Sequence, residues 1–327
     1  MTQPVLDIRG LRVTLRTEEA EITALDDISF EIGRGEVLGI VGESGAGKSI
    51  TGAAIIDLLV PPLRRTAGSI TLDGTRLDGL DERAMRRIRG RRIGYVFQDP
   101  MTSLNPVLTV GRQLVDTIKA HLDLDSAAAR KKALHWLERV GLPDPAAALK
   151  RYPHELSGGM RQRVVIALAL SAEPVLLIAD EPTTALDVSV QAHILKLLRD
   201  LHEESGISML LITHDLGVVA KMADRVAVFY AGRIAEISPA LSLFEHPRHP
   251  YTEGLLKATP APSRTGRDHV IQPIPGAMPA LGAGPAGCAF HPRCGRASAS
   301  CRTEVPPLAG EGGAFYACFH PLAGGRR

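Results

Sequence analysis

The sequence predicts an α/β fold in which helices cover both faces of a largely parallel sheet. Solidly apolar segments that suit buried strands alternate with segments of helical periodicity, a pattern typical of such sheets. The 327 residues, 45% hydrophobic and 23% charged, suffice for about two domains with a sizeable core. From Pro260 onward, ten prolines and eleven glycines resist long helices and regular sheet.

The expected strands are short and mostly apolar. The first is expected near a sheet edge, and the second ends at a glycine-rich turn, as suits a buried strand. In chain order the expected strands are Thr23–Ile32, Glu36–Val41, Arg92–Phe97, Val175–Asp180, Ser208–Thr213 and Arg225–Tyr230.

The expected helices carry apolar residues three or four positions apart. Ser189–Glu204 shows this spacing most clearly and predicts an amphipathic helix. Lys48–Leu59 and Val218–Ala223 are also predicted to be helical. The pattern between about residues 107 and 156 is helical, notably over Ala127–Val140, and predicts a helical insertion in the α/β body.

Charge and hydropathy exclude several classes of protein. A net charge of +2 neither shows the basic field typical of nucleic-acid binding nor excludes a local basic patch. The longest aliphatic runs, such as Val175–Ala179, are far shorter than the ~20 residues of a membrane helix. The N-terminus lacks the basic and apolar regions of a secretory signal. We therefore expect an intracellular chain that can still sit on a membrane by docking to a partner.

A glycine-rich motif stands between the apolar run that ends at Val41 and the predicted helix that follows. Its sequence, Gly42-Glu-Ser-Gly-Ala-Gly-Lys-Ser49, matches G-x-x-x-x-G-K-[ST], a phosphate loop. Glycines let backbone N–H groups wrap phosphates, and the helix N-terminus adds its positive dipole end. Lys48 can reach the β- and γ-phosphates, and the Ser49 hydroxyl can bind Mg²⁺. The predicted nucleotide-binding residues here are Gly42, Glu43, Ser44, Gly45, Ala46, Gly47, Lys48 and Ser49.

A second nucleotide element is predicted where the apolar run Val175–Asp180 ends in two carboxylates. Asp180 suits indirect coordination of Mg²⁺, and Glu181 suits a base that orients the attacking water. Acids at a strand end are usually only a solvated turn. Because a phosphate loop lies upstream, we interpret this pair as catalytic.

The residues around these two elements resemble the ATP-binding-cassette ATPases over roughly residues 5–240. Leu156-Ser-Gly-Gly-Met-Arg-Gln-Arg163 resembles the signature motif of that family. Gln98 and His214 each follow a predicted strand, and the loop Ala185-Leu-Asp187 follows Glu181, all in the order that the family shows.

The resemblance implies a head-to-tail pair of nucleotide-binding domains that share their ATP sites. Ser157, Gly158 and Gly159 would contact the γ-phosphate in the opposite site. Gln98 would sense Mg²⁺ and the γ-phosphate, and His214 would hold the γ-phosphate and help to position water. The implied catalytic residues are Glu181, His214 and Gln98; the implied Mg²⁺ residues are Ser49, Gln98 and Asp180; Asp187 joins the nucleotide-binding set.

The same resemblance implies the fold class and the domain organisation. The fold would be a P-loop ATPase of the ABC type, with a RecA-like sheet core, a helical subdomain and an irregular cysteine-containing C-terminal extension. We expect the nucleotide-binding domain over residues 1–258, its helical subdomain over about 99–156, and the extension over 259–327.

Three further segments resemble the ATPase subunits of dipeptide and oligopeptide importers. They are Gln98-Asp-Pro-Met-Thr-Ser-Leu-Asn-Pro106, Arg151-Tyr-Pro-His-Glu-Leu-Ser157 and His249-Pro-Tyr-Thr-Glu-Gly-Leu-Leu256. This resemblance implies ATP-driven peptide uptake with two membrane permease subunits, an extracytoplasmic peptide-binding protein and a second ATPase, usually a paralogue. It places the chain peripherally on the cytoplasmic face of the inner membrane. Nickel importers and other peptide-like importers share much of this pattern.

Two other classes of protein are weighed against the importer. A nucleic-acid-associated cassette ATPase usually carries a long coiled coil or two cassettes, whereas this chain has one signature and no sustained heptads. A metal-sensing protein with a degenerate ATPase is opposed by a complete set of site residues: Lys48, Ser49, Asp180, Glu181 and His214. We therefore expect no nucleic-acid partner.

All four cysteines lie in the C-terminal extension, spaced as Cys288-x5-Cys294-x6-Cys301-x16-Cys318. In an intracellular chain such a cluster favours a metal or iron–sulfur site over disulfides. The spacing lacks the paired knuckles of common zinc fingers, and four thiolates are the usual ligands of a [4Fe–4S] cluster. The importer subfamily carries such a cluster in this tail, so the resemblance favours iron–sulfur over zinc or free thiols. His291 and His320 are expected to be bystanders.

The adenine platform and the permease-docking surface of the family are less clearly indicated by this sequence. The segment before the phosphate-loop strand has no aromatic residue to stack on adenine, so Leu15 or Ile22 would give an apolar platform instead. Permease helices would dock beside the helical insertion, where Met101, Leu104 and Val107 are candidates for apolar contact or for the core.

Overall fold

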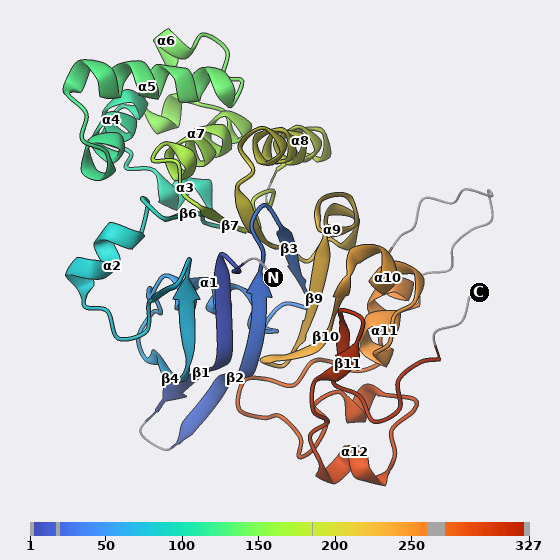
Figure 1. Ribbon diagram of the computed structural model, residues 1–327. Helices are drawn as coiled ribbons and strands as arrows, with labels where there is room; N and C mark the ends of the chain where they lie inside the picture. The colour runs from blue at the N-terminus through green and yellow to red at the C-terminus, as the bar shows by residue number, and fades with distance from the viewer. Residues whose placement is uncertain (1–2, 18–19, 185, 260–271, 324–327) are drawn as a thin grey trace, which may run out of the picture. The chain divides into compact units, whose positions relative to one another are not determined.

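The computed structural model describes residues 3–17, 20–184, 186–259 and 272–323 (Figure 1). These residues form two compact units, each assembled from several stretches of chain. Unit 1 comprises residues up to Leu6, Glu31–Glu36 and Thr71–Leu211. Unit 2 comprises Asp7–Phe30, Val37–Ile70 and the chain from Ile212 onward. The predicted boundary after residue 258 adjoins residues 260–271, which lie outside the described residues, and it stays a prediction.

Unit 1 is built on buried parallel strands. β6 (Ile93–Val96) pairs in parallel with β7 (Leu176–Asp180), and β8 (Ser208–Ile212) is the next strand. Every residue of β7 is buried, as an apolar strand with both faces covered requires. The ends of β6 and β7 are in register from Ile93 and Leu176 to Val96 and Ala179. Side chains that directly follow these two strands are therefore brought to one sheet edge.

Most of the other elements of unit 1 are helices (Figure 1). Thr109 and Asp125 cap the two long helices of the insertion by accepting hydrogen bonds from backbone N–H groups, as N-cap residues do. The elements are β5 (Thr75–Arg76), α2 (Glu82–Ile88), α3 (Pro100–Ser103), α4 (Val110–His121), α5 (Ser126–Arg139), α6 (Pro145–Ala148), a 3₁₀ turn (Pro153–Glu155), α7 (Gly158–Leu170) and α8 (Val188–Ser205).

Unit 2 carries five neighbouring strands in the order β11-β12-β10-β9-β3. β3 (Val37–Val41) is parallel to β9 (Arg225–Tyr230), and β9 forms an antiparallel pair with β10 (Arg233–Pro239). β1 (Leu6–Arg16), β2 (Glu21–Ile32) and β4 (Leu63–Leu72) belong to a second sheet with β2 at its edge. The helices are α1 (Lys48–Ile55), α9 (Leu216–Met222), α10 (Ala240–Glu245) and α11 (Pro250–Ala258).

Where the structure describes it, the C-terminal extension contributes only short elements, as its proline and glycine content predicts. They are a 3₁₀ turn (His291–Arg293), α12 (Ala299–Thr303), β11 (Ala309–Glu311) and β12 (Ala314–Tyr316). β12 nonetheless pairs with β10 through Tyr316 and Phe315, which the sequence did not indicate. Phe290 is buried against Tyr230 and Tyr251, so the extension joins the core of unit 2.

One predicted helix is shorter than expected. Lys48–Leu59 was predicted to be helical, but α1 ends at Ile55. Asp57 takes a left-handed φ of 53°, which breaks the helix although apolar residues continue beyond it. Among the described residues, no helix is both long and apolar enough to span a bilayer.

Candidate functional site

The predicted phosphate loop connects β3 to α1 within unit 2, in the strand–loop–helix context that the motif requires. Gly42 and Gly47 take φ values of 153° and 102°. A Cβ atom on Gly42 would lie 2.3 Å from the Phe229 carbonyl oxygen, and one on Gly47 would lie 2.5 Å from a Leu25 methyl group. Glycine is therefore needed at both positions for steric reasons within the fold.

The Lys48 side chain points back into the phosphate loop. Its side chain is 5% exposed, and Nζ donates hydrogen bonds to the carbonyl oxygens of Gly42 (2.9 Å) and Glu43 (3.1 Å). A buried ammonium needs such acceptors because its desolvation is costly. Phosphate oxygens at the mouth of the loop are stronger acceptors of the same kind.

The carboxyl ends of β6 and β7 bring three predicted site residues together in unit 1. Gln98 follows β6, while Asp180 ends β7 and Glu181 comes next. Gln98 Nε2 donates to Glu181 Oε2 at 3.0 Å, and the Thr184 hydroxyl donates to the same oxygen at 2.8 Å. Glu181 has a φ of 47°, so the chain turns sharply at this residue. The carboxylate is thus held in one orientation beside an exposed amide.

Tyr95 is a residue of this edge that the sequence analysis missed. Its hydroxyl donates to Asp180 Oδ2 at 3.1 Å. Burial and the negative charge of Asp180 raise the pKa of the Tyr95 hydroxyl, so it remains a donor. Because Tyr95 lies in β6 opposite Ile178 of β7, its position next to Asp180 follows from strand register alone. A tyrosine within a predicted strand gave no separate signal.

The signature residues stand at the start of α7 in unit 1. Ser157 is the N-cap, and its exposed hydroxyl accepts a hydrogen bond from the Met160 N–H at 3.3 Å. A Cβ atom on Gly159 would lie 2.7 Å from a Val190 methyl group. Glycine is therefore needed at this position, while the exposed Ser157 hydroxyl and the backbone N–H groups of the helix start are of the kind that bind anions.

Gln162 links the signature helix to the loop after β7. Its side chain is 1% exposed, and Nε2 donates to the Pro182 carbonyl oxygen at 2.7 Å. Pro182 directly follows Glu181. One buried hydrogen bond thus connects α7 to the segment that carries the predicted base.

The remaining nucleotide-site predictions fall in both units. His214 is exposed and precedes Asp215, which caps α9 by accepting from the Gly217 N–H at 2.7 Å. Asp187 is exposed in unit 1 and is the N-cap of α8 by position. Ala185 of the same loop lies outside the described residues. Of the predicted set, Gly42–Ser49 and His214 belong to unit 2, and the others belong to unit 1.

Of the proposed adenine platforms, Ile22 lines a cavity beside the phosphate loop. Within unit 2, a cavity of about 400 Å³ is bordered by Ile22, Thr23, Gly45 and, from the extension, residues 279–282 and Gly284. Gly282 packs so closely that a Cβ atom there would lie 2.8 Å from the Ile22 side chain. Leu15, the alternative platform, is half-buried.

The three candidate residues for permease contact differ in how exposed their side chains are. Met101 and Val107 are 59% and 75% exposed, whereas Leu104 is 3% exposed. For Leu104, the core alternative therefore applies. The two exposed side chains remain predicted contacts.

The four cysteines of unit 2 line one cavity of about 10 Å³. The Cys288 N–H donates to the Cys301 carbonyl oxygen at 2.9 Å, and Cys301 is buried. Burial raises the pKa of the Cys288 and Cys294 thiols and raises that of Cys318 to about 11. The cysteines form no disulfide. Thiols with raised pKa values are inert unless a metal or another cation stabilises their thiolates.

The spacing of the possible donor side chains does not by itself define a metal site. Among the described residues, no group of three or more histidine, cysteine or acidic side chains stands close enough to hold a metal ion. The iron–sulfur prediction therefore rests on the donor chemistry of the four thiols alone. Near the thiols, His291 Nδ1 contacts the Cys288 carbonyl oxygen at 3.0 Å, and His320 contacts Ser298 at 2.7 Å.

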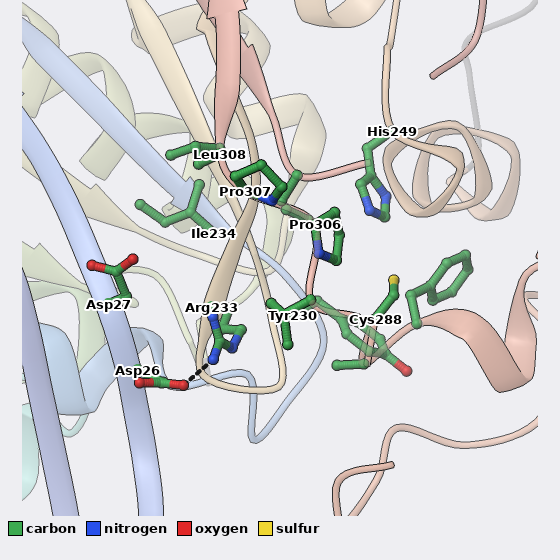
Figure 2. A pocket seen from close by; sticks show the side chains of 15 residues that line it. Asp26, Asp27, Tyr230, Arg233, Ile234, His249, Cys288, Pro306, Pro307 and Leu308 are labelled. Atoms are coloured by element: carbon green, nitrogen blue, oxygen red, sulfur yellow. Dashed lines mark hydrogen bonds and ion pairs between the residues drawn. The ribbon is translucent and has the colours of Figure 1, made fainter. Parts of the chain in front are cut away.

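Cys288 also borders a larger cavity of about 230 Å³ (Figure 2). Asp26 and Arg233 form an ion pair on one side of it. Ile234, Pro306, Pro307 and Leu308 supply apolar walls. The extension thus builds one wall of this cavity, and Cys288 is the cysteine that both cavities share.

Comparison with known proteins supports the class that this site indicates. Residues 25–184 match the family "ABC transporter", and residues 235–301 match "Oligopeptide/dipeptide transporter, C-terminal region". A dimeric ATP-binding cassette, MJ0796, solved with ADP and Pi, is 30% identical with a TM-score of 0.65 and covers 72% of this chain and 98% of its own. CbiO1 from Clostridium perfringens is 30% identical with a TM-score of 0.64 and covers 74% and 91%. The chain belongs to the ABC ATPases.

Relatives narrow this class further. A peptide import ATP-binding protein of Brucella melitensis is 51% identical over 317 residues, 94% of each chain. The dipeptide transport ATP-binding protein DppD of Bacillus subtilis is 48% identical over 93% of this chain and 90% of its own. The chain belongs with them as an ATP-binding subunit of a dipeptide/oligopeptide ABC importer. Members of this family bind ATP with Mg²⁺ and act as ATPase dimers with permease subunits at the membrane.

Proposed function

We propose that this chain hydrolyses ATP with Glu181 as the base that orients the attacking water. The observation that carries the proposal is the fixed Glu181 carboxylate, which accepts hydrogen bonds from Gln98 and Thr184 at 3.0 and 2.8 Å. A base held in one orientation loses little entropy when it meets water, which is how positioning lowers a barrier. Water attacks the γ-phosphorus, the bond to ADP breaks, and Glu181 draws off the developing proton.

The phosphate loop of the same chain would hold the nucleotide. The backbone N–H groups of Gly42–Ser49 wrap the β- and γ-phosphates, and Lys48 exchanges its carbonyl acceptors for phosphate oxygens. Ser49, Gln98 and Asp180 offer the oxygen donors that Mg²⁺ prefers, and the ion would neutralise charge on the phosphates. Tyr95 keeps the Asp180 carboxylate oriented. His214 would hold the γ-phosphate.

The complete site needs a second ATPase subunit. We place Ser157, Gly158 and Gly159 on the γ-phosphate of the partner, because the start of α7 offers a hydroxyl and N–H groups. Asp187 lies in the same interface. The partner is a paralogue, so the working pair is a heterodimer.

The transport assignment is the import of di- or oligopeptides. Two permease subunits and an extracytoplasmic peptide-binding protein complete the importer, and Met101 and Val107 contact the permease. The chain then sits peripherally on the cytoplasmic face of the inner membrane. The functions of the 51% and 48% identical relatives, peptide import and dipeptide transport, support peptides over nickel. Uptake of labelled dipeptides and of nickel by cells with and without this gene would decide between them.

We further propose that Cys288, Cys294, Cys301 and Cys318 bind one [4Fe–4S] cluster. The donor chemistry supports this proposal, because four thiolates are the usual ligands of such a cluster. When bound, the cluster would supply thiolate–iron bonds that link residues far apart in the sequence. Iron analysis of anaerobically purified protein tests this assignment separately from ATP hydrolysis.

A further inference from the structure

Glu43, the second residue of the phosphate loop, is held by the C-terminal part of the chain. Its backbone N–H donates to the Tyr251 hydroxyl at 3.0 Å. Its carboxylate accepts two hydrogen bonds from Arg293, at 2.7 Å from Nη1 and 3.1 Å from Nη2. Its carbonyl oxygen accepts from Lys48. Three groups of one loop residue are thus fixed, two of them by residues more than 200 positions away.

Arg293 is a buried residue of the cysteine-bearing segment. Its side chain is only 4% exposed, and Nε donates to the Pro275 carbonyl oxygen at 2.8 Å. The guanidinium also lies 5.8 and 5.9 Å from the ring centres of Tyr230 and Phe290. The paired hydrogen bonds to Glu43 raise the pKa of Arg293 and so keep it charged. Such a buried charge depends strongly on its partner.

We propose that Arg293 is a positioning residue for the phosphate loop and makes ATP affinity depend on the order of the cysteine segment. Arg293 directly precedes Cys294 and lies five residues after Cys288. Any change that displaces this segment therefore pulls on Glu43 or releases it. The inference rests on the proposed ATP-binding role of Gly42–Ser49, but it does not depend on which metal the cysteines hold.

The physical argument is a linkage between two sites. Bidentate arginine–carboxylate bonds fix geometry as well as charge, so their loss leaves Glu43 free to sample conformations that do not wrap phosphate. Part of the free energy of nucleotide binding is then used to order the loop, so the ATP affinity falls. The coupling is reciprocal: if the segment favours ATP binding, bound ATP must favour the ordered segment by the same factor.

The test measures ATP dissociation constants on the full-length chain at a temperature at which all variants are folded. Arg293→Met and Glu43→Gln should each weaken ATP binding about fivefold or more. The double variant should bind ATP about as the single variants do, because each change breaks the same contact. Arg293→Lys keeps the charge but not the paired geometry. Its ATP dissociation constant should therefore lie between those of the wild type and Arg293→Met. Arg302→Met, an exposed arginine of the same segment, is the matched control and should leave affinity unchanged.

A second measurement separates coupling from a general loss of stability. Hydrogen exchange of residues 287–301 should slow on ATP binding in the wild type, and this response should shrink in Glu43→Gln. Arg293 variants that melt earlier but bind ATP as the wild type does would overturn the proposal, as would fully additive effects in the double variant. If the wild type itself binds no ATP, the proposed function is wrong. Lys48→Ala identifies that case, because it then causes no further loss of ATP binding.

Discussion

At the scale of single residues, Glu181 gives the clearest prediction. Glu181→Gln keeps the hydrogen-bonding shape of the side chain but removes its basicity. We expect ATP binding to persist while hydrolysis in the assembled transporter falls by a factor of roughly 10²–10⁴, the usual contribution of a general base. Phosphate release and nucleotide binding are measured on the same preparation. Turnover close to that of the wild type would exclude Glu181 as the base.

Lys48 should behave in the opposite way. Lys48→Ala removes a buried ammonium that now bonds two loop carbonyls and would bond phosphates. The loss of charge-assisted hydrogen bonds of about 1.5–3 kcal/mol corresponds to roughly tenfold or more in ATP affinity. Titration with ATP should show weaker binding even where no hydrolysis occurs. Unchanged affinity would remove Lys48 from the phosphate site.

The sequence revealed site residues whose signal is local, and it missed those whose partners are distant. Gly42–Ser49 is a contiguous motif, and its glycines proved necessary for local packing. Tyr95 was missed because its bond to Asp180 depends on strand register. Arg293 was missed because its partner, Glu43, lies 250 positions away in the chain. No local pattern encodes such a contact.

At the scale of elements, the fold class followed from apolar strands that alternate with helices, and the relatives confirm it. The end of α1 could not be predicted, because periodicity continues through Ile56 and Leu58 while the backbone turns at Asp57. Nor could β12 be predicted, because the three residues Ala314–Tyr316 become a strand by pairing with β10. Short edge strands take their structure from tertiary contacts.

The cap of α11 predicts a pH effect on stability. His249 is 3% exposed, and its Nδ1 accepts a hydrogen bond from the Tyr251 N–H at 3.0 Å. Burial lowers its pKa to about 4 in the folded state, against about 6.5 when unfolded. Between these values the unfolded chain binds more protons, so the free energy of unfolding falls as the pH drops from about 6.5 toward 4. The limiting slope is about 1.4 kcal/mol per pH unit.

His249→Asn provides the comparison for this effect. Asparagine can still accept a hydrogen bond at the N-cap, but it does not titrate. Urea unfolding at pH 7 and pH 5 should show a smaller loss of stability for this variant than for the wild type. Equal losses would mean that His249 is protonated in the folded chain as readily as in the unfolded one.

At the scale of the whole molecule, the composite site predicts that the purified chain is a poor ATPase and largely monomeric. Under the proposed assignment, each active site needs Ser157–Gly159 from a partner subunit, which we propose to be a paralogue. Hydrolysis should rise when the chain is reconstituted with the permeases, the second ATPase, and the binding protein with its cargo. High activity that does not depend on the concentration of the isolated chain would contradict the shared site.

The proposed iron–sulfur assignment predicts a coloured protein. Anaerobically purified chain should be brown, with about four irons per chain and broad absorbance near ~400 nm. Replacing any one of the four cysteines by serine should abolish the cluster and make the extension sensitive to protease, because ligand bonds and local folding are coupled. Colourless protein with stoichiometric zinc would replace iron–sulfur with a structural zinc site.

The hydrogen bond between Gln162 and the Pro182 carbonyl oxygen has a consequence for the coupling between the two ATP sites of the proposed dimer. Under the proposed assignment, α7 serves the nucleotide of the neighbouring subunit, while the segment at Pro182 serves the chain's own nucleotide. A single buried amide ties these two together at 2.7 Å. If phosphate release from the neighbouring subunit's site shifts α7, this hydrogen bond would pass the shift to Glu181 within the same chain.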